Sequence, residues 1–170
     1  MMIGAVELEV TRCRPDETGR ILEIVNAAAE AYRGVIPSDR WHDPYMTGDE
    51  LAAEIAAGVD FWGCRSGGNL VGIMGMQPVR DVILIRHAYV HPSRQRSGIG
   101  GVLLRRIREA SDRRILVGTW AAADWAISFY ERNGFRLVPR DRVAPLLRTY
   151  WTVPERQIET SVVLADPPLG

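Results

Sequence analysis

Apolar residues recur at two spacings along this chain, and each spacing predicts a different kind of element. A helical stripe runs through residues 16–32, with Ile21, Ile24 and Val25 on one face and Asp16 as the expected cap. Residues 82–90 are apolar almost throughout, as expected of a strand covered on both faces. By the same rules, strands are predicted at 6–13, 61–65, 70–78, 114–120, 135–138 and 158–164, and helices at 49–57, 99–111, 124–133 and 142–150.

The order of these elements predicts a mixed α+β fold. Antiparallel strands, two of them joined by the turn signal Ser66-Gly67-Gly68-Asn69, precede one strand–helix–strand crossover. This order favours a mixed, mostly antiparallel sheet flanked by helices. No repeat or low-complexity linker interrupts the chain, so residues 1–170 are expected to form a single domain.

The junction between the strand at 82–90 and the helix at 99–111 is rich in glycine and arginine. It runs His91-Pro92-Ser93-Arg94-Gln95-Arg96-Ser97-Gly98-Ile99-Gly100-Gly101. Unpaired N–H groups and the positive end of the helix dipole at such a turn can hold a phosphate or diphosphate. Gly98 and Gly100 would let the ligand approach the backbone, because no Cβ intervenes. Plain turn geometry explains the same glycines, so this motif alone leaves both interpretations open.

Composition narrows the class of function. The formal net charge is zero, which argues against nucleic acid or an anionic membrane as a partner. No apolar run is long enough to span a membrane, and residues 1–7 do not resemble a signal peptide. Cys13 and Cys64 have no metal-ligand spacing, so we expect reduced thiols, a cytoplasmic location and no metal.

Two motifs, taken together, resemble the GNAT family of acetyl-coenzyme A-dependent N-acetyltransferases. Gln95-x-x-Gly98-x-Gly100, preceded by Val90-His91-Pro92, is similar to the family's pyrophosphate loop. Residues 126–135, AISFYERNGF, are similar to its A-x-x-F-Y-x-x-x-G-F signature. The resemblance implies a GNAT-like fold and acetyl-coenzyme A as cosubstrate. One position departs from the pattern, because many relatives carry Asn where this chain has Ala123.

The resemblance also implies which residues bind the coenzyme. Backbone amides from Gln95 to Gly100 would hold the diphosphate, and main-chain groups of residues 88–90 would pair with the pantetheine arm. Arg94 and Arg96 would either contact phosphate or belong to a solvated basic turn. The predicted coenzyme-binding set is Ala88, Tyr89, Val90, Gln95, Arg96, Ser97, Gly98, Ile99, Gly100, Gly101 and Tyr130.

Attack of an amine on a thioester needs a proton acceptor and benefits from a proton donor. Tyr130 matches the family's general acid, although an aromatic that packs the helix on the sheet would look the same. His87 is the best single candidate for the base, because imidazole titrates in the useful range. A core histidine is an equal alternative, and which face His87 occupies depends on whether the strand contains a bulge. Glu54 and Asp81 are weaker candidates, and a chain of water molecules needs no dedicated base.

The resemblance further implies an acceptor site at the loop after the first helix, with Tyr32, Arg33, Trp41 and Tyr45 as candidate substrate-binding residues. Asp43 or Glu54 would attract a cationic amine, and Arg33 or Arg40 a carboxylate. The aromatic residues could instead simply seal the gap between helix and sheet. The apolar connection at 139–154 would cover the site or a homodimer partner.

Two functions follow from these features. The first is an enzyme that moves an acetyl group from acetyl-coenzyme A to a primary amine, expected to be on a small molecule. The alternative is a non-catalytic domain of the same fold that holds an acyl-coenzyme A as a sensor or structural ligand. Release of free thiol in the presence of amines would separate the two, because a sensor binds the coenzyme without releasing thiol.

Overall fold

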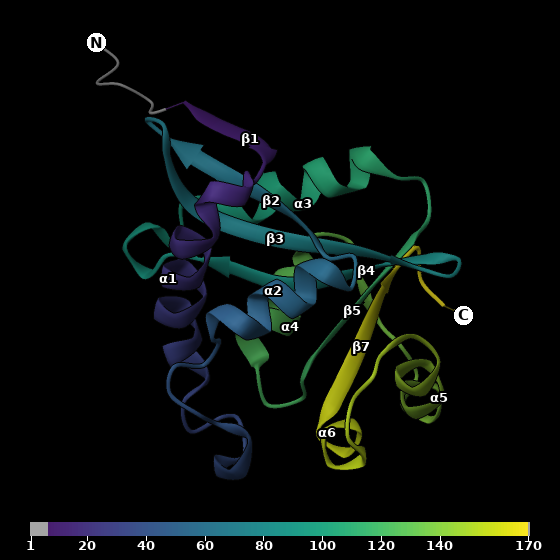
Figure 1. The fold of residues 1–170 in the computed structure, drawn as a ribbon. Coiled ribbons are helices and arrows are strands. Elements are labelled where there is room, and N and C mark those ends of the chain that lie inside the picture. Colours follow the sequence, from purple (N-terminus) through teal and green to yellow (C-terminus); the bar gives the residue numbers. More distant parts are fainter. Residues whose placement is uncertain (1–6, 170) are drawn as a thin grey trace.

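A seven-stranded sheet with helices on both faces forms the described part of the chain, residues 7–169 of a computed structural model (Figure 1). The strand order is β1-β2-β3-β4-β5-β7-β6, and every pair of neighbours is antiparallel except β4 and β5. This confirms the mixed, mostly antiparallel sheet predicted from the element order. The strands are β1 (Leu8–Arg12), β2 (Asp60–Ser66), β3 (Asn69–Val79), β4 (Val82–Val90), β5 (Arg114–Trp120), β6 (Arg136–Leu137) and β7 (Ser161–Asp166).

The helices divide between the two faces of the sheet, as the three buried clusters show. One cluster packs α3 and α4 against one face, whereas the α1–α2 cluster and the α5–α6 cluster lie side by side on the other. In Figure 1, α2 crosses in front of the central strands and α3 runs behind them. The helices are α1 (Thr18–Ala29), α2 (Gly48–Ala56), α3 (Ile99–Ala110), α4 (Asp124–Arg132), α5 (Arg140–Tyr150) and α6 (Glu155–Glu159).

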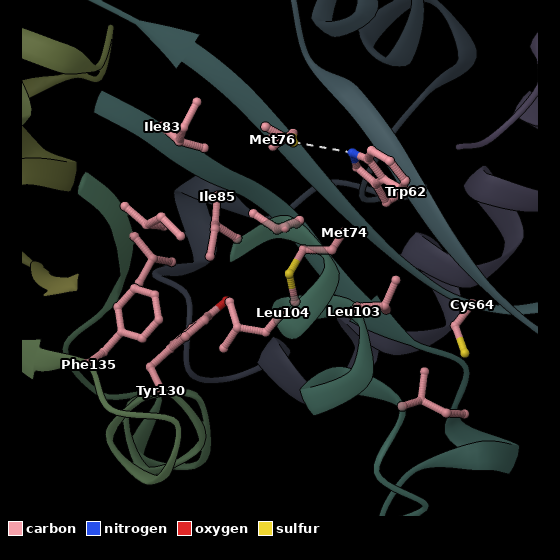
Figure 2. Close-up of a cluster of buried hydrophobic side chains, with 14 of the residues drawn as sticks. Trp62, Cys64, Met74, Met76, Ile83, Ile85, Leu103, Leu104, Tyr130 and Phe135 are labelled. Carbon is pink, nitrogen blue, oxygen red and sulfur yellow. Dashed lines mark hydrogen bonds between the residues drawn. The ribbon is translucent and has the colours of Figure 1, made fainter. Parts of the chain in front are cut away.

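The core under α3 and α4 is the largest of the three clusters. Leu103, Leu104 and Phe135 are fully buried in it. Figure 2 shows Trp62 of β2 reaching Met76 of β3, where the indole Nε1–H donates to the sulfur at 3.2 Å. The buried side chains of α3 hold the first turn of the helix against the sheet, and the predicted anion site lies at that turn.

A β-bulge interrupts the pairing of β3 with β4. Ile73 pairs with Tyr89 and Gly75 with Arg86, so two residues of β4, His87 and Ala88, lie opposite one residue of β3. His87 adopts a left-handed backbone with φ of 57°. A Cβ on Gly75 would lie 2.6 Å from the Arg86 carbonyl oxygen, so this glycine leaves room for the bulge.

The bulge exchanges the faces of β4. Ile85 belongs to the α3–α4 cluster, and strict alternation would place Tyr89 on the same side. Tyr89 instead packs against the α1–α2 cluster, while Ala88 and Val90 pack against the α3–α4 cluster.

Beyond the bulge, β4 and β5 no longer pair. Their parallel register covers only Val82–Ile85 and residues 114–117, after which β5 pairs only with β7. The second half of β4 still pairs with β3 but diverges from β5, which leaves a gap between β4 and β5 in the sheet.

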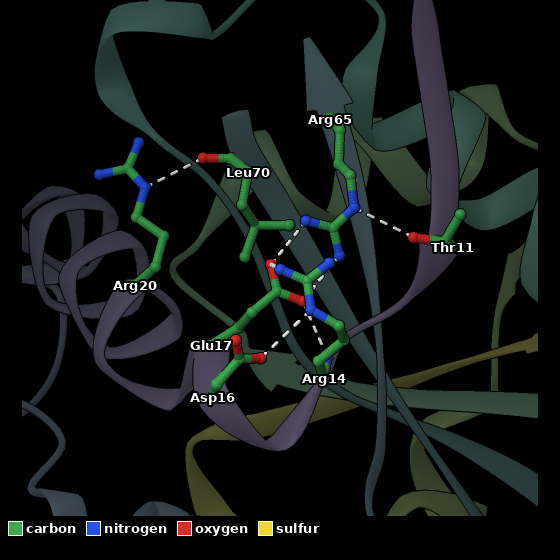
Figure 3. A network of polar contacts seen from close by, with 7 residues as sticks. All are labelled: Thr11, Arg14, Asp16, Glu17, Arg20, Arg65 and Leu70. Atoms are coloured by element: carbon green, nitrogen blue, oxygen red, sulfur yellow. Dashed lines mark hydrogen bonds and ion pairs between the residues drawn. The ribbon is translucent and has the colours of Figure 1, made fainter. Parts of the chain in front are cut away.

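A buried ion pair ties the start of α1 to β2, and Figure 3 shows its surroundings. The Arg65 guanidinium meets both oxygens of Glu17 at 2.5 and 2.7 Å, and its Nε–H donates to Thr11 of β1 at 3.1 Å. The cap prediction for Asp16 is wrong, because Pro15–Glu17 forms a separate 3-10 turn. Glu17 accepts the Arg14 N–H at 2.8 Å, while the Asp16 carboxylate pairs with the Arg14 side chain.

Other boundaries also differ from the prediction: the helix predicted at 16–32 is Thr18–Ala29, and a 3-10 turn follows it at Glu30–Tyr32. The last strand is Ser161–Asp166 instead of 158–164, because Ile158 lies in α6, where it is buried beneath the helix. The helix predicted at 142–150 begins two residues earlier and continues through Pro145. The first residue of the strand predicted at 6–13, Val6, lies outside the described residues.

Candidate functional site

A cavity of about 680 Å³ occupies the gap between β4 and β5. Its walls come from all three clusters: Tyr130 from the α3–α4 side, Tyr89 from the α1–α2 side and Leu147 from the α5–α6 side. The cavity therefore extends through the sheet and reaches both of its faces.

The first turn of α3 forms one end of this cavity. Its first intrahelical hydrogen bond runs from Val102 N–H to the Gly98 carbonyl at 3.1 Å. The N–H groups of Ile99, Gly100 and Gly101 therefore come before the ladder and have no acceptor within the helix. Arg96 and Gly98 have left-handed φ values of 65° and 82°, the kind of turn in which backbone N–H groups converge on an anion.

The two glycines of the predicted pyrophosphate loop have different surroundings. A Cβ on Gly98 would meet nothing within 4 Å, so this side of the turn is open to a ligand. A Cβ on Gly100 would lie 2.9 Å from the Phe129 ring, so this glycine allows α3 and α4 to pack closely. The open turn, the converging N–H groups and the helix dipole fit a diphosphate.

The structure brings together almost the whole predicted coenzyme-binding set. Ser97 is the exception: it is exposed and does not line the cavity, and its hydroxyl donates to the Arg94 carbonyl. Arg94 lines the cavity together with Arg96. The members that line the cavity are Ala88, Tyr89, Val90, Gln95, Arg96, Gly98, Ile99, Gly100, Gly101 and Tyr130. Their contacts with a coenzyme stay a prediction.

Tyr130 lies in the core and also at the cavity wall. Its side chain is 5% exposed and makes edge contacts with Phe129 and Phe135 at ring-centre distances of 5.0 and 5.5 Å. Figure 2 shows the ring among the apolar side chains of the α3–α4 cluster. Burial raises the pKa of Tyr130 above its usual range, so the phenol keeps its proton at neutral pH.

His87 lines the same cavity and contacts a carboxylate on α2. Its Nε2 lies 3.0 Å from Oε2 of Glu54, and the Arg86 guanidinium lies 2.9 Å from the same oxygen. The hydrogen bond with His87 holds the pKa of Glu54 below its usual range. The charge of Arg86 also lowers this pKa, and the two together outweigh the opposite effect of burial. Glu54 is therefore a carboxylate engaged by two partners, which makes it a poor proton acceptor. Asp81, the other weak candidate, accepts a hydrogen bond from Tyr150 at 2.7 Å and does not line the cavity.

The predicted acceptor residues separate into two groups. Tyr32 and Tyr45 line the cavity, whereas Arg33 and Trp41 do not. The Arg33 guanidinium pairs with Glu30 and Asp43 at 2.8 and 3.1 Å and lies 4.6 Å from the Trp41 ring centre. Arg33 and Asp43 therefore neutralise each other in the loop, and the Arg40 side chain lies outside the described part of the structure.

Trp125 of α4 and Gln157 of α6 are cavity residues that were not identified from the sequence. Leu147 and Trp151 also line the cavity, and both belong to the apolar connection at 139–154 that was predicted to cover the site or a dimer partner. The composition of this connection did not distinguish a site wall from a dimer contact. In the part of the chain that the structure describes, no group of His, Cys, Asp and Glu could hold a metal ion. No helix among the same residues is both long and apolar enough to cross a membrane.

Three comparisons with known proteins concern the family and the fold of this chain. Residues 57–137 match the family model described as an acetyltransferase (GNAT) domain. Searching the curated proteins finds no match. Many solved structures share the fold at low sequence identity, so this likeness concerns the fold alone.

Three of these structures illustrate the likeness. A GNAT-family acetyltransferase from Staphylococcus aureus Mu50 has a TM-score of 0.69 at 16% identity, covering 94% of this chain and 98% of that one. The PaiA N-acetyltransferase from Thermoplasma acidophilum, solved with coenzyme A, has the same TM-score and coverage at 15% identity. A GNAT-family acetyltransferase from Brucella melitensis, solved with acetyl-coenzyme A, has a TM-score of 0.56 at 22% identity, covering 77% of this chain and 84% of that one.

Proposed function

We propose that this chain transfers an acetyl group from acetyl-coenzyme A to the primary amine of a small molecule, because residues 57–137 match the model of the acetyltransferase (GNAT) domain. The observation that carries this proposal is the open first turn of α3, where free N–H groups line the same cavity as Tyr130 and His87. An anion site and two proton-handling side chains around one cavity are the parts that the reaction needs.

In the proposed reaction, the neutral amine nitrogen attacks the thioester carbonyl, a C–N bond forms and the C–S bond breaks. The proton that the nitrogen loses on becoming an amide neutralises the departing thiolate, which leaves as the free thiol. An alkylammonium of pKa near 10 is only about one part in a thousand neutral at pH 7, so it must lose a proton first. We assign His87 as the acceptor of this proton. Glu54 would orient the imidazole through Nε2 and stabilise its protonated form, leaving Nδ1 to take the proton.

Tyr130 would act on the departing thiolate. Its raised pKa lies above that of an ordinary thiol, which is about 8.5. A phenol of this kind stabilises the thiolate by donating a hydrogen bond and does not give up its proton completely. This role requires only that the hydroxyl faces the sulfur in the bound complex.

The test is a thiol-release assay on the purified protein with acetyl-coenzyme A and a panel of amines, combined with calorimetry of coenzyme binding. We expect binding, and thiol release that depends on the added amine. His87→Gln should abolish most of the activity, because no imidazole remains to take the proton of the ammonium group. Asp81→Asn, at a carboxylate outside the cavity, is the matched control and should leave the rate unchanged.

The alternative function, a non-catalytic acyl-coenzyme A sensor, predicts a different outcome of the same assay. A sensor would bind the coenzyme in the calorimeter and release no thiol with any amine. Failure of both binding and release would exclude both functions. The cytoplasmic location and the homodimer stay predictions, with the unpaired thiols of Cys13 and Cys64 in keeping with the former.

A further inference from the structure

The acceptor side of the cavity differs chemically from the coenzyme side. Arg94, Arg96 and Arg132 lie with α3 and α4, on the side of the predicted diphosphate. On the opposite side of the sheet the wall is made by Tyr32, Tyr45 and Tyr89 near α1, and by Leu147, Trp151 and Val153 near α5 and α6. An amine that enters from this side reaches the thioester through a passage lined with aromatic and aliphatic groups.

No carboxylate lines this cavity among the residues that the structure describes. The nearest candidate, Glu54, lies behind His87 and Arg86 and is engaged by both. Arg86 itself lines the cavity and also donates to Gln77 at 2.9 Å. A polyamine would therefore leave water, meet cationic side chains and find no counter-ion for its additional charges.

The aromatic side chains offer a different kind of recognition. The ring centre of Tyr32 lies 5.1 Å from that of Trp125 and 6.4 Å from that of Tyr89, so this tyrosine bridges the two sides of the gap. Trp151 lies against the backbone of Gly118 on β5, where a Cβ would be only 3.5 Å from its ring. Such rings bind another aromatic group by offset or edge contacts and attract a single ammonium group through their faces.

We infer that the acceptor is a monoamine attached to an aromatic or similarly apolar body, and that Trp151 sets this specificity. This inference rests on the proposed acetyl transfer. The α5–α6 segment then supplies one wall of the acceptor site, instead of only covering the sheet.

The experiment compares 2-phenylethylamine with spermidine as acceptors in the thiol-release assay. We expect kcat/KM for 2-phenylethylamine to exceed that for spermidine by about 10- to 100-fold, the range that an apolar pocket supplies. Trp151→Ala should raise KM for 2-phenylethylamine about 10-fold, while the Kd of acetyl-coenzyme A stays near the wild-type value. Trp151→Phe keeps an aromatic ring and should restore most of the loss.

Gln157→Glu adds the missing carboxylate to the cavity wall with almost no change in shape. If the absence of a counter-ion excludes polyamines, this variant should shift the ratio of kcat/KM toward spermidine. The result therefore does not depend on whether Trp151→Ala remains folded.

The outcomes are distinguishable. A wild-type preference for spermidine, or a ratio that Gln157→Glu does not move, would overturn the acceptor class while leaving acetyl transfer in place. Binding of acetyl-coenzyme A without thiol release from any amine would overturn the proposed function and this inference with it.

Discussion

Tyr130 shows how one residue can belong to a core and to a site at once. Its ring packs between Phe129 and Phe135, and its side chain also lines the cavity between β4 and β5. The sequence motif raised both roles and could not separate them. The phenolic oxygen contributes little to apolar packing, so removing it tests the chemistry with little change to the core.

Tyr130→Phe should therefore lower kcat about 10- to 100-fold, because it removes a hydrogen bond to the departing thiolate. The Kd of acetyl-coenzyme A and the melting temperature should change little. Tyr150→Phe removes a hydroxyl that donates to Asp81 outside the cavity and keeps the ring, so it serves as the control for kcat. Wild-type turnover in Tyr130→Phe would leave the residue with a packing role only.

At the scale of elements, the packing of α3 on the sheet determines where the proposed anion site lies. Its apolar stripe buries Ile99, Leu103 and Ile107 against the sheet, which directs the open first turn at the cavity. Gly72 on β3 assists, because a Cβ there would lie 2.6 Å from the Ile99 side chain. The position of the anion site thus depends on the packing of the whole helix.

Gly98→Glu should weaken the binding of acetyl-coenzyme A by about 100-fold or more, since a carboxylate would occupy the anion site and repel the diphosphate. Gly68→Glu is the matched control. Gly68 has nearly the same left-handed φ, 83° against 82°, equally open surroundings, and a place in the β2–β3 hairpin outside this cavity. Both variants should lose similar stability on thermal unfolding, and only Gly98→Glu should lose binding in the calorimeter. Equal affinities in the two variants would remove the diphosphate site from this turn.

At the scale of the whole molecule, the Glu17–Arg65 pair links segments that are far apart in the sequence. Arg65 contacts Glu17 before α1 and Thr11 on β1, so three segments meet at one guanidinium (Figure 3). Glu17 is 9% exposed, and its hydrogen bonds to Arg65 lower its pKa from 4.5 to about 2. The stabilisation is complete above pH 4.5, where unfolded Glu17 is already ionised, and is lost as the pH falls through about 2.

Glu17→Gln should lower the free energy of unfolding at pH 7 by about 3 kcal/mol, because it leaves the buried Arg65 without its counter-charge. The loss should shrink below pH 4.5, so the urea-unfolding midpoints of variant and wild type should converge toward pH 2. Asp16→Asn alters a neighbouring, 74% exposed carboxylate and should cost less than about 1 kcal/mol at any pH. A difference between Glu17→Gln and wild type that stays constant with pH would contradict the assigned role.

Much of the fold could be predicted because local patterns determine it. The turn signal between β2 and β3, the apolar run of β4 and the stripe of α3 all specify elements within a short window of sequence. Errors occurred where a distant contact decided the outcome. Ile158 has a strand-like neighbourhood in the sequence, yet it lies in α6 because that short helix buries it on the sheet. Asp16 looks like a cap, but it lies in the separate 3-10 turn Pro15–Glu17, where Glu17 pairs with Arg65 of β2.

The sequence by itself determined the order of the elements as far as α5, the glycine turn before α3 and the identity of the side chains available for chemistry, because each depends on residues adjacent in the chain. Only the tertiary structure decided the bulge at His87, the contact of its imidazole with Glu54, and the exclusion of Arg33 and Trp41 from the cavity. These depend on how separate segments pack, and the clearest case is Trp151, which reaches the cavity because α5 and α6 fold across β5 and β7. Local spacing carries no information about which distant surfaces will meet, so the acceptor side of the site became visible only in the folded chain.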